Sequence, residues 1–223
     1  MWVRFGSNAF ANVLTGVSAI AFQLGLTALA SRSFDAATFS VWTLAVSMAG
    51  LTPLFAANLT AVVTRQLVPV QMGTDRDAAG AIMTSARWIS RGLAALAVLT
   101  ILLTSLLLHR ASPDLASTDI GIFIFAVLLL TFGQLWQITL QPALGWHYAR
   151  EQNWPVASAL FLVRFSGLSA MWLATRSRIG DLSATALCLA LGLWLGVGLA
   201  QACSFIPKVE ARGKRAGDRK SVV

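Results

Sequence analysis

Residues 119–141 read DIGIFIFAVLLLTFGQLWQITLQ, a stretch of 23 residues whose single charged side chain, Asp119, stands at its edge. An α-helix that crosses the hydrocarbon core of a bilayer needs about 20 consecutive, mostly apolar residues. A helix of this length on the surface of a soluble protein would instead carry charged residues along the face that meets water. The stretch therefore predicts a transmembrane helix.

Five further stretches of the chain repeat this apolar pattern between short polar segments. Together they predict spans at about 9–31, 39–62, 88–109, 119–141, 155–175 and 183–206. Of the 223 residues, 57% are hydrophobic and 12% charged, which is about half the charged fraction of a soluble domain. We therefore predict an all-α, polytopic membrane protein with about six transmembrane helices in one bundle, formed by residues 1–207.

Several local signals bear on where these helices begin, bend or end. Pro53 and Pro142 lie inside or at the end of predicted spans, where a proline is expected to kink or stop the helix. Pro155 suits the first turn of the fifth span. The longest predicted inner loop, 64–87, contains Thr74-Asp75-Arg76-Asp77, where Asp or Thr would cap a helix that runs into the third span.

The first span also has an alternative interpretation as a cleaved signal peptide. Arg4 would serve as its basic start and Ala28-Leu29-Ala30 would fit a signal-peptidase site. Against this, residues 6–12 are polar and Gln23 interrupts the apolar run, which is long for a signal peptide. We therefore favour an uncleaved first span.

The distribution of Lys and Arg predicts the orientation, because short cytoplasmic loops carry an excess of basic residues. With the N-terminus inside, the inner side holds twelve basic residues and the outer side four. The inner set is Arg4, Arg65, Arg76, Arg87, Arg91, Arg150, Lys208, Arg212, Lys214, Arg215, Arg219 and Lys220, and the outer set is Arg32, Arg110, Arg176 and Arg178. Six spans then place both termini in the cytoplasm, and residues 208–223 form a basic tail that we expect to be disordered.

No constellation of catalytic or metal-binding residues is apparent. All nine carboxylates fall in loops, at the edge of a span or in the tail, and the two histidines, His109 and His147, fall on different loops. A proton or sodium relay built on a buried Asp or Glu is therefore not supported. We expect no enzymatic activity, no cofactor and no nucleic-acid partner.

Arg164 is the exception among the charged residues, because it lies well inside a predicted span. It follows Pro155 by nine residues, roughly 13 Å along a helix. A lone charge near the middle of a bilayer costs a few kcal/mol on insertion scales. Arg164 is then expected to face a wet cavity or an anionic ligand. The alternative is an arginine that extends to the membrane interface from a span that begins later.

Two further sets of polar residues share helix faces in the predicted spans. Gln134, Gln137 and Gln141 fall at i, i+3 and i+7, and Asn58 and Arg65 are seven residues apart. The glutamines would either line a cavity and bind a sugar or head group, or hydrogen-bond neighbouring helices. Arg65 would either anchor its helix at the cytoplasmic interface or contact a ligand phosphate. Both pairs of interpretations stay open.

Four sequence motifs follow one another in a characteristic order along the chain. They are GSNAFANVLTG (6–16), TALASRSFDAATFSVWTLAVS (27–47), LTAVVTRQLV (59–68) and GWHYAREQNWPVASALFLVRFSGL (145–168). In this order they resemble the polysaccharide flippases of the O-antigen exporter type, in the multidrug/oligosaccharidyl-lipid/polysaccharide exporter superfamily. The likeness extends to about Phe205, although Ser40 stands where that family usually has a glycine.

The resemblance implies transport of a lipid-linked oligosaccharide, such as a lipopolysaccharide precursor, across the bacterial inner (plasma) membrane. The family is usually built of two six-helix lobes around a cationic central cavity, and this chain corresponds to one lobe. Two identical copies in the same orientation would rebuild the pair, so a homodimer is one expected arrangement. By location alone, Arg164 and Arg65 match cavity arginines that attract an anionic polyprenyl diphosphate, because the motifs single out neither residue.

Two functions of different kinds follow from the sequence. The first is a flippase-type transporter, or half-transporter, that moves a lipid-linked oligosaccharide for polysaccharide export. The second is a non-transporting membrane scaffold subunit of a cell-envelope glycan assembly complex, which the short loops and single lobe fit equally well. For the first function the expected substrate-binding residues are Arg164, Arg65, Gln134, Gln137, Gln141 and Asn58.

The charge distribution makes a direct prediction about topology. Reporter fusions after residues 80 and 215 should give cytoplasmic signals, and fusions near residues 35, 113 and 180 should give periplasmic signals. Paired alkaline phosphatase and green fluorescent protein fusions at each position measure this. A periplasmic signal at residue 80 would overturn the predicted orientation of every span.

Overall fold

A computed structural model describes residues 2–72, 76–111, 120–177 and 181–203. Within these ranges the chain is helical apart from short connections, and the described residues form no strand. The elements are α1 (Trp2–Ser33), α2 (Ala36–Ala49), the 3-10 helix η1 (Thr52–Ala56), α3 (Leu59–Met72), α4 (Arg76–Ala111), α6 (Ile120–Gln134), α7 (Trp136–Thr139), α8 (Gln141–Ala149), α9 (Asn153–Arg176) and α10 (Leu182–Ala202). The predicted all-α fold is confirmed. The predicted tail, 208–223, lies outside the described residues.

Six helical segments of the described chain are long and apolar enough to cross a membrane, so the chain is a multi-pass membrane protein. They are Ser7–Ser33, Ala36–Val70, Asp77–Arg110, Ile120–Ala149, Asn153–Arg176 and Leu182–Ala202. Their bounds differ most from the sequence prediction around 64–87, because α3 continues to Met72 and α4 begins at Arg76. Most of the expected inner loop is therefore helical. Asp77 lies in the first turn of α4, where a carboxylate favours the helix N-terminus.

Two of the six spans are interrupted. The second span consists of α2, η1 and α3, and the fourth consists of α6, α7 and α8. Pro53 lies at the start of η1 and Pro142 at the start of α8, so both prolines stop a helix as the sequence predicts. Proline has no backbone N–H for the carbonyl four residues earlier. At the first break the Thr52 hydroxyl replaces it, donating to the carbonyl oxygen of Ala49 at 2.6 Å.

Aspartates begin two of the helices that follow short turns. The Asp35 carboxylate accepts a hydrogen bond from the Thr38 backbone N–H at 2.7 Å, and Asp181 accepts one from the Ala184 N–H at 3.1 Å. These bonds satisfy N–H groups that have no partner within the helix. The bond from Thr38 also holds the pKa of the Asp35 carboxyl below its ordinary value. Both turns lie at the end of the bundle that the charge distribution assigns to the outside.

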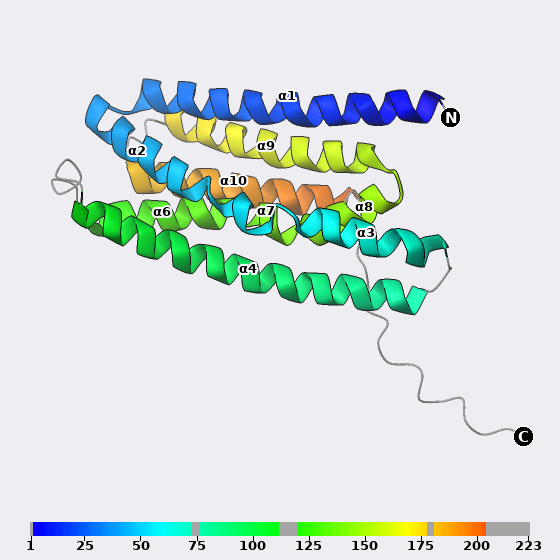
Figure 1. Cartoon of the computed structure of the whole chain (residues 1–223). Helices are drawn as coiled ribbons and strands as arrows, with labels where there is room; N and C mark the ends of the chain where they lie inside the picture. The colour runs from blue at the N-terminus through cyan, green and yellow to red at the C-terminus, as the bar shows by residue number, and fades with distance from the viewer. Residues whose placement is uncertain (1, 73–75, 112–119, 178–180, 204–223) are drawn as a thin grey trace, which may run out of the picture.

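Figure 1 shows how the spans pack side by side. α1 lies on α9, α9 lies on α10, and α10 lies on α6. On the other side of the bundle, α3 packs on α8 and α4, and α2 packs on α6. α1 and α2 join at the turn around Asp35, and from there α1 and α3 diverge along the bundle (Figure 1). α1 begins and α10 ends at the same end of the molecule, as an even number of crossings requires.

Glycines bring α9 and α10 into close contact. A Cβ added at Gly192 would lie 2.4 Å from the Ala170 Cβ, and one added at Gly196 would lie 2.5 Å from the Val163 Cα. Small residues at such positions let the backbones of membrane helices approach closely. The Gly192-x-x-x-Gly196 pattern, which is weak evidence in the sequence alone, therefore lies in the contact surface of these two helices.

This contact predicts that methyl groups at Gly192 and Gly196 destabilise the bundle. Gly192→Ala and Gly196→Ala should each lower stability by about 1–3 kcal/mol, the usual cost of overpacking. Gly198→Ala is the matched control, since an added Cβ there meets no atom within 4 Å. Thermal unfolding of the three variants in one detergent measures the effect. Equal midpoints for Gly196→Ala and Gly198→Ala would contradict the packing.

Candidate functional site

Arg164 lies at the middle of α9 and is fixed there by α1. It is the twelfth of the 24 residues of this helix, which is about 36 Å long at 1.5 Å per residue. Its Nη1 donates to the carbonyl oxygen of Thr15 at 2.7 Å and to the hydroxyl of Ser18 at 2.6 Å. The Ser18 hydroxyl in turn donates to the Thr15 carbonyl at 2.9 Å. One nitrogen of the guanidinium is thus held by two residues of the first span.

The charge of Arg164 has no anionic partner among the described residues. The carboxylates in the described ranges, at Asp35, Asp77, Glu151 and Asp181, lie at helix ends and turns rather than inside spans. A guanidinium has five N–H donors, and the described bonds of Arg164 use those of Nη1. Its Nε and Nη2 donors have no partner in the described part of the chain. A half-buried cation with unused donors is suited to binding an anion.

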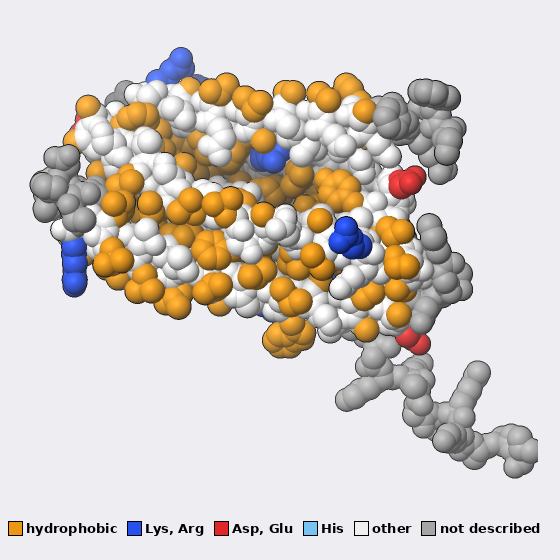
Figure 2. All heavy atoms as spheres, in the orientation of Figure 1, with side chains coloured by type: hydrophobic (Ala, Val, Ile, Leu, Met, Phe, Trp, Pro, Cys, Tyr) orange, Lys and Arg blue, Asp and Glu red, His pale blue; other side chains and the backbone are white. Residues whose placement is uncertain are grey.

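The surface of the molecule is hollowed between α1 and α3. Figure 2 shows this hollow with many apolar side chains and with a Lys or Arg side chain at its floor. A second basic side chain is visible over α3 on the same face, and α3 contains Arg65 as its one Lys or Arg. The open face between these two helices therefore combines apolar walls with positive charge.

Arg65 is exposed on α3 and Asn58 is exposed in the turn before it, and no described hydrogen bond connects either side chain to Arg164. Asn58 directly precedes Leu59, so it stands where the second span resumes its α-helix. The structure thus places these two predicted residues on and beside α3, and neither takes part in the α1–α9 contact that holds Arg164. Their predicted role in substrate binding stays a prediction.

The three predicted glutamines lie at the breaks of the fourth span and point inward. Gln134 is buried, and Gln137 and Gln141 are half-buried. The side-chain amide of Gln137 donates to the side-chain oxygen of Gln134, and the Gln141 amide donates to the carbonyl oxygen of Gln137 at 2.8 Å. The side-chain oxygen of Gln141 accepts a hydrogen bond from the Thr60 hydroxyl of α3. This arrangement matches the helix-bonding interpretation, and the glutamines form no hydrogen bond with Arg164.

Sequence reasoning missed the residues that hold Arg164, although a signal for them exists. Asn8, Asn12, Thr15 and Ser18 recur at spacings of three or four, so they share one face of α1. The structure directs this face at α9 and the turn before it: Asn8 donates to the Glu151 carbonyl oxygen and Asn12 accepts from Asn153, both at 3.3 Å. Asn12 therefore bonds α1 to the first residue of α9, whereas Gln23 is exposed.

Outside these contacts, the described residues include buried side-chain atoms without a hydrogen-bond partner, among them the Thr131 hydroxyl oxygen and the Trp136 indole nitrogen. A search of the described residues finds no group of three His, Cys, Asp or Glu side chains able to hold a metal ion. Comparison of the chain with protein-family models, curated proteins and solved structures gives no match.

The position of Arg164 predicts that water reaches it. In a background with Cys188→Ser and Cys203→Ser, Arg164→Cys should react with a small, membrane-impermeant thiol reagent from one side of the membrane. Val163→Cys is the control, since Val163 has 0% exposure and neighbours Arg164. Mass spectrometry of the labelled protein measures the difference. Equal protection of both positions from both sides would mean that the guanidinium faces packed helices or lipid.

Proposed function

We propose that this chain is a flippase-type transporter, or one half of such a transporter, for an anionic lipid-linked oligosaccharide in a bacterial inner membrane. The observation that carries the proposal is Arg164, a cation at the middle of a 24-residue span with unused N–H donors and no carboxylate partner among the described residues. A charge at that depth is costly unless something compensates it. The missing negative charge would arrive with the substrate.

A diphosphate head group fits these donors. The guanidinium is planar and presents paired N–H groups that match two oxygens of one phosphate, whereas an ammonium acts as a point charge. Because Nη1 is fixed by Thr15 and Ser18, the remaining donors have a defined direction before a ligand binds. Such preorganisation lowers the entropy lost on binding. The apolar walls of the hollow would accommodate part of the lipid.

The sequence resemblance corresponds to one lobe of a two-lobe flippase, so the proposed transporter would be completed by a second copy. Two copies in the same orientation would be related by an axis along the membrane normal. In this arrangement the open faces between α1 and α3 would meet and enclose the two Arg164 side chains. The cytoplasmic placement of both termini is part of the same proposal.

A scaffold subunit of a glycan assembly complex is the second candidate, and one observation favours it. Several polar side chains inside the spans bond to neighbouring helices or to each other, including Asn12, Thr60 and the three glutamines. A scaffold needs such bonds only to hold its own fold. Under this function Arg164 would simply fasten α9 to α1 through Thr15 and Ser18.

Substitution of Arg164 distinguishes the two functions. Arg164→Lys keeps the charge but loses the planar pair of donors, so transport should fall partly. Arg164→Ala should reduce transport at least about tenfold, the factor that corresponds to about 1.4 kcal/mol, a loss expected for a charged hydrogen bond. The measurement is cell-surface glycan together with lipid-linked precursor retained inside, in a strain dependent on this protein.

The matched control for this experiment is Arg176→Ala, which removes an exposed arginine from the end of the same helix. It should leave transport unchanged at equal expression. Removal of a buried charge eases membrane insertion, so a loss confined to the Arg164 variants is not explained by failed insertion. Normal transport by Arg164→Ala would favour the scaffold function.

A further inference from the structure

The hydrophobic interior of the described chain is divided into two separate cores. The smaller core joins α3 to the first half of α4, where Leu59, Val63 and Leu67 pack with Ala79, Met83 and Ala86. Ile138 of α7 belongs to the same core, and Trp146 of α8 packs against it. The larger core contains buried residues of α1, α2, α6, α9 and α10. The division runs through α4, because Ala97 belongs to the smaller core and Ile101 to the larger. A compact domain usually has one contiguous core, so the two parts are candidates for separate rigid bodies.

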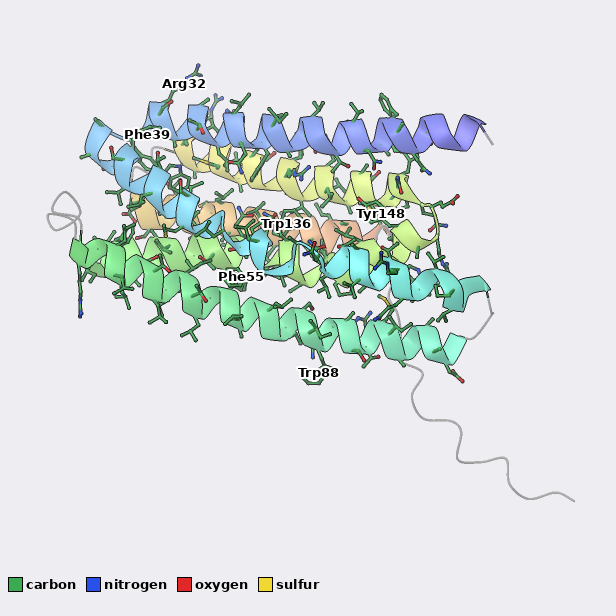
Figure 3. The ribbon with its side chains drawn as sticks, in the orientation of Figure 1. Arg32, Phe39, Phe55, Trp88, Trp136 and Tyr148 are labelled. Atoms are coloured by element: carbon green, nitrogen blue, oxygen red, sulfur yellow. The ribbon has the colours of Figure 1, made fainter. Side chains whose placement is uncertain are left out.

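The backbone is interrupted where the two cores meet. The second span loses its α-helix between Ala49 and Leu59, and the fourth span breaks at Leu135 and Leu140. The middle pieces of these two spans, η1 and α7, contact each other and also contact α4. Figure 3 shows Phe55 of η1 and Trp136 of α7 near the middle of the bundle's length. Residues between helical segments can absorb the backbone rotation of a hinge.

The second and fourth spans contact each other through different helices on the two sides of their breaks. On one side of the breaks α2 packs on α6, and on the other side α3 packs on α8. α8 packs mainly on α3, although its Leu144 lies in the larger core. The Thr64 hydroxyl of α3 donates to the Gly145 carbonyl oxygen of α8 at 3.3 Å, and a Cβ added at Gly145 would lie 2.8 Å from the Val63 side chain. α8 therefore goes with α3.

We infer that α3, α8 and the first half of α4 form an arm that turns as one body about the breaks in the second and fourth spans. The arm is defined as Leu59–Met72, residues 76–97 and Gln141–Ala149, and the rest of the described chain is the base. α4 continues without a break from the arm into the base, so bending of α4 between Ala97 and Ile101 accompanies the turn. α3 is one wall of the hollow, whereas α1 and Arg164 of α9 belong to the base. Turning of the arm therefore changes the width of the hollow between α1 and α3. This inference goes beyond the proposed function, because it requires no particular ligand.

Distances between spin labels in lipid nanodiscs test the arm directly. With Cys188→Ser and Cys203→Ser as background, Gly16→Cys on α1 and Ala61→Cys on α3 place one label on the base and one on the arm. Gly16→Cys with Gly198→Cys is a control pair within the base, and Ala61→Cys with Gly92→Cys is a control pair within the arm. An added Cβ at Gly16, Gly92 or Gly198 meets no atom within 4 Å, and Ala61 is exposed, so the labels should not disturb packing.

The base–arm pair should give a distance distribution that is wider than both control distributions or that has two maxima. Restoring N–H groups at the breaks with Pro53→Ala and Pro142→Ala should narrow this distribution towards the controls, because α-helix can then continue through the hinge. The control pairs should not change. If the base–arm distribution is as narrow as both controls in the unsubstituted hinge, the arm does not move and the inference is wrong. That comparison decides the question even if the proline variants do not fold.

Discussion

A backbone polar group that loses its helical partner inside a membrane must find another within the protein, because hydrocarbon supplies none. This constraint shapes the described chain at its two interrupted spans. At the first break, the Thr52 hydroxyl donates to the carbonyl that Pro53 leaves without a partner. At the second, the Phe132 carbonyl accepts from the Leu135 backbone N–H at 3.2 Å and also from the Trp194 indole of α10 at 2.9 Å, and Gln141 donates to the Gln137 carbonyl. Side chains therefore add hydrogen bonds to carbonyls at the breaks and, in the case of Trp194, bind a neighbouring helix at the same time.

The same constraint distinguishes polar side chains whose hydrogen bonds lie within the protein from Arg164, whose charge has no counter-ion among the described residues. Gln134, Gln137 and Gln141 repair and connect the fourth span, so their presence in a hydrophobic helix needs no ligand as its explanation. Arg164 differs in kind. Its two described bonds hold one nitrogen of the guanidinium, while the positive charge stays without a carboxylate among the described residues. The proposed ligand is therefore supported by a single unbalanced charge rather than by the number of polar groups in the spans.

The sequence was sufficient for the number of spans, the helix stops at Pro53 and Pro142, and the position of Arg164 inside an apolar helix. These depend on length, hydropathy and proline chemistry, which are local properties. The sequence did not predict which helices contact each other. Thr15 and Ser18 are separated from Arg164 by more than 140 residues, and Thr60 is 81 residues from Gln141. The sequence also gave no indication of two cores, because α4 is one uninterrupted apolar helix whose change of partner between Ala97 and Ile101 depends on its neighbours.

Arg164 lies on α9, a helix that is packed closely on both sides. α9 is held on one side by α10, where Gly196 leaves no room for a methyl group beside Val163, and on the other by the hydrogen bonds to α1. A charge on such a helix keeps a fixed position and direction, which electrostatic recognition requires because the energy of a charged hydrogen bond falls steeply with poor geometry. α3 packs in the smaller core with the first half of α4 and is joined to α2 through a stretch without α-helix. Under the proposed function, a fixed cation on the base and an arm that turns would let one site hold an anion and then release it, since opening the hollow admits water and weakens every charge interaction inside it.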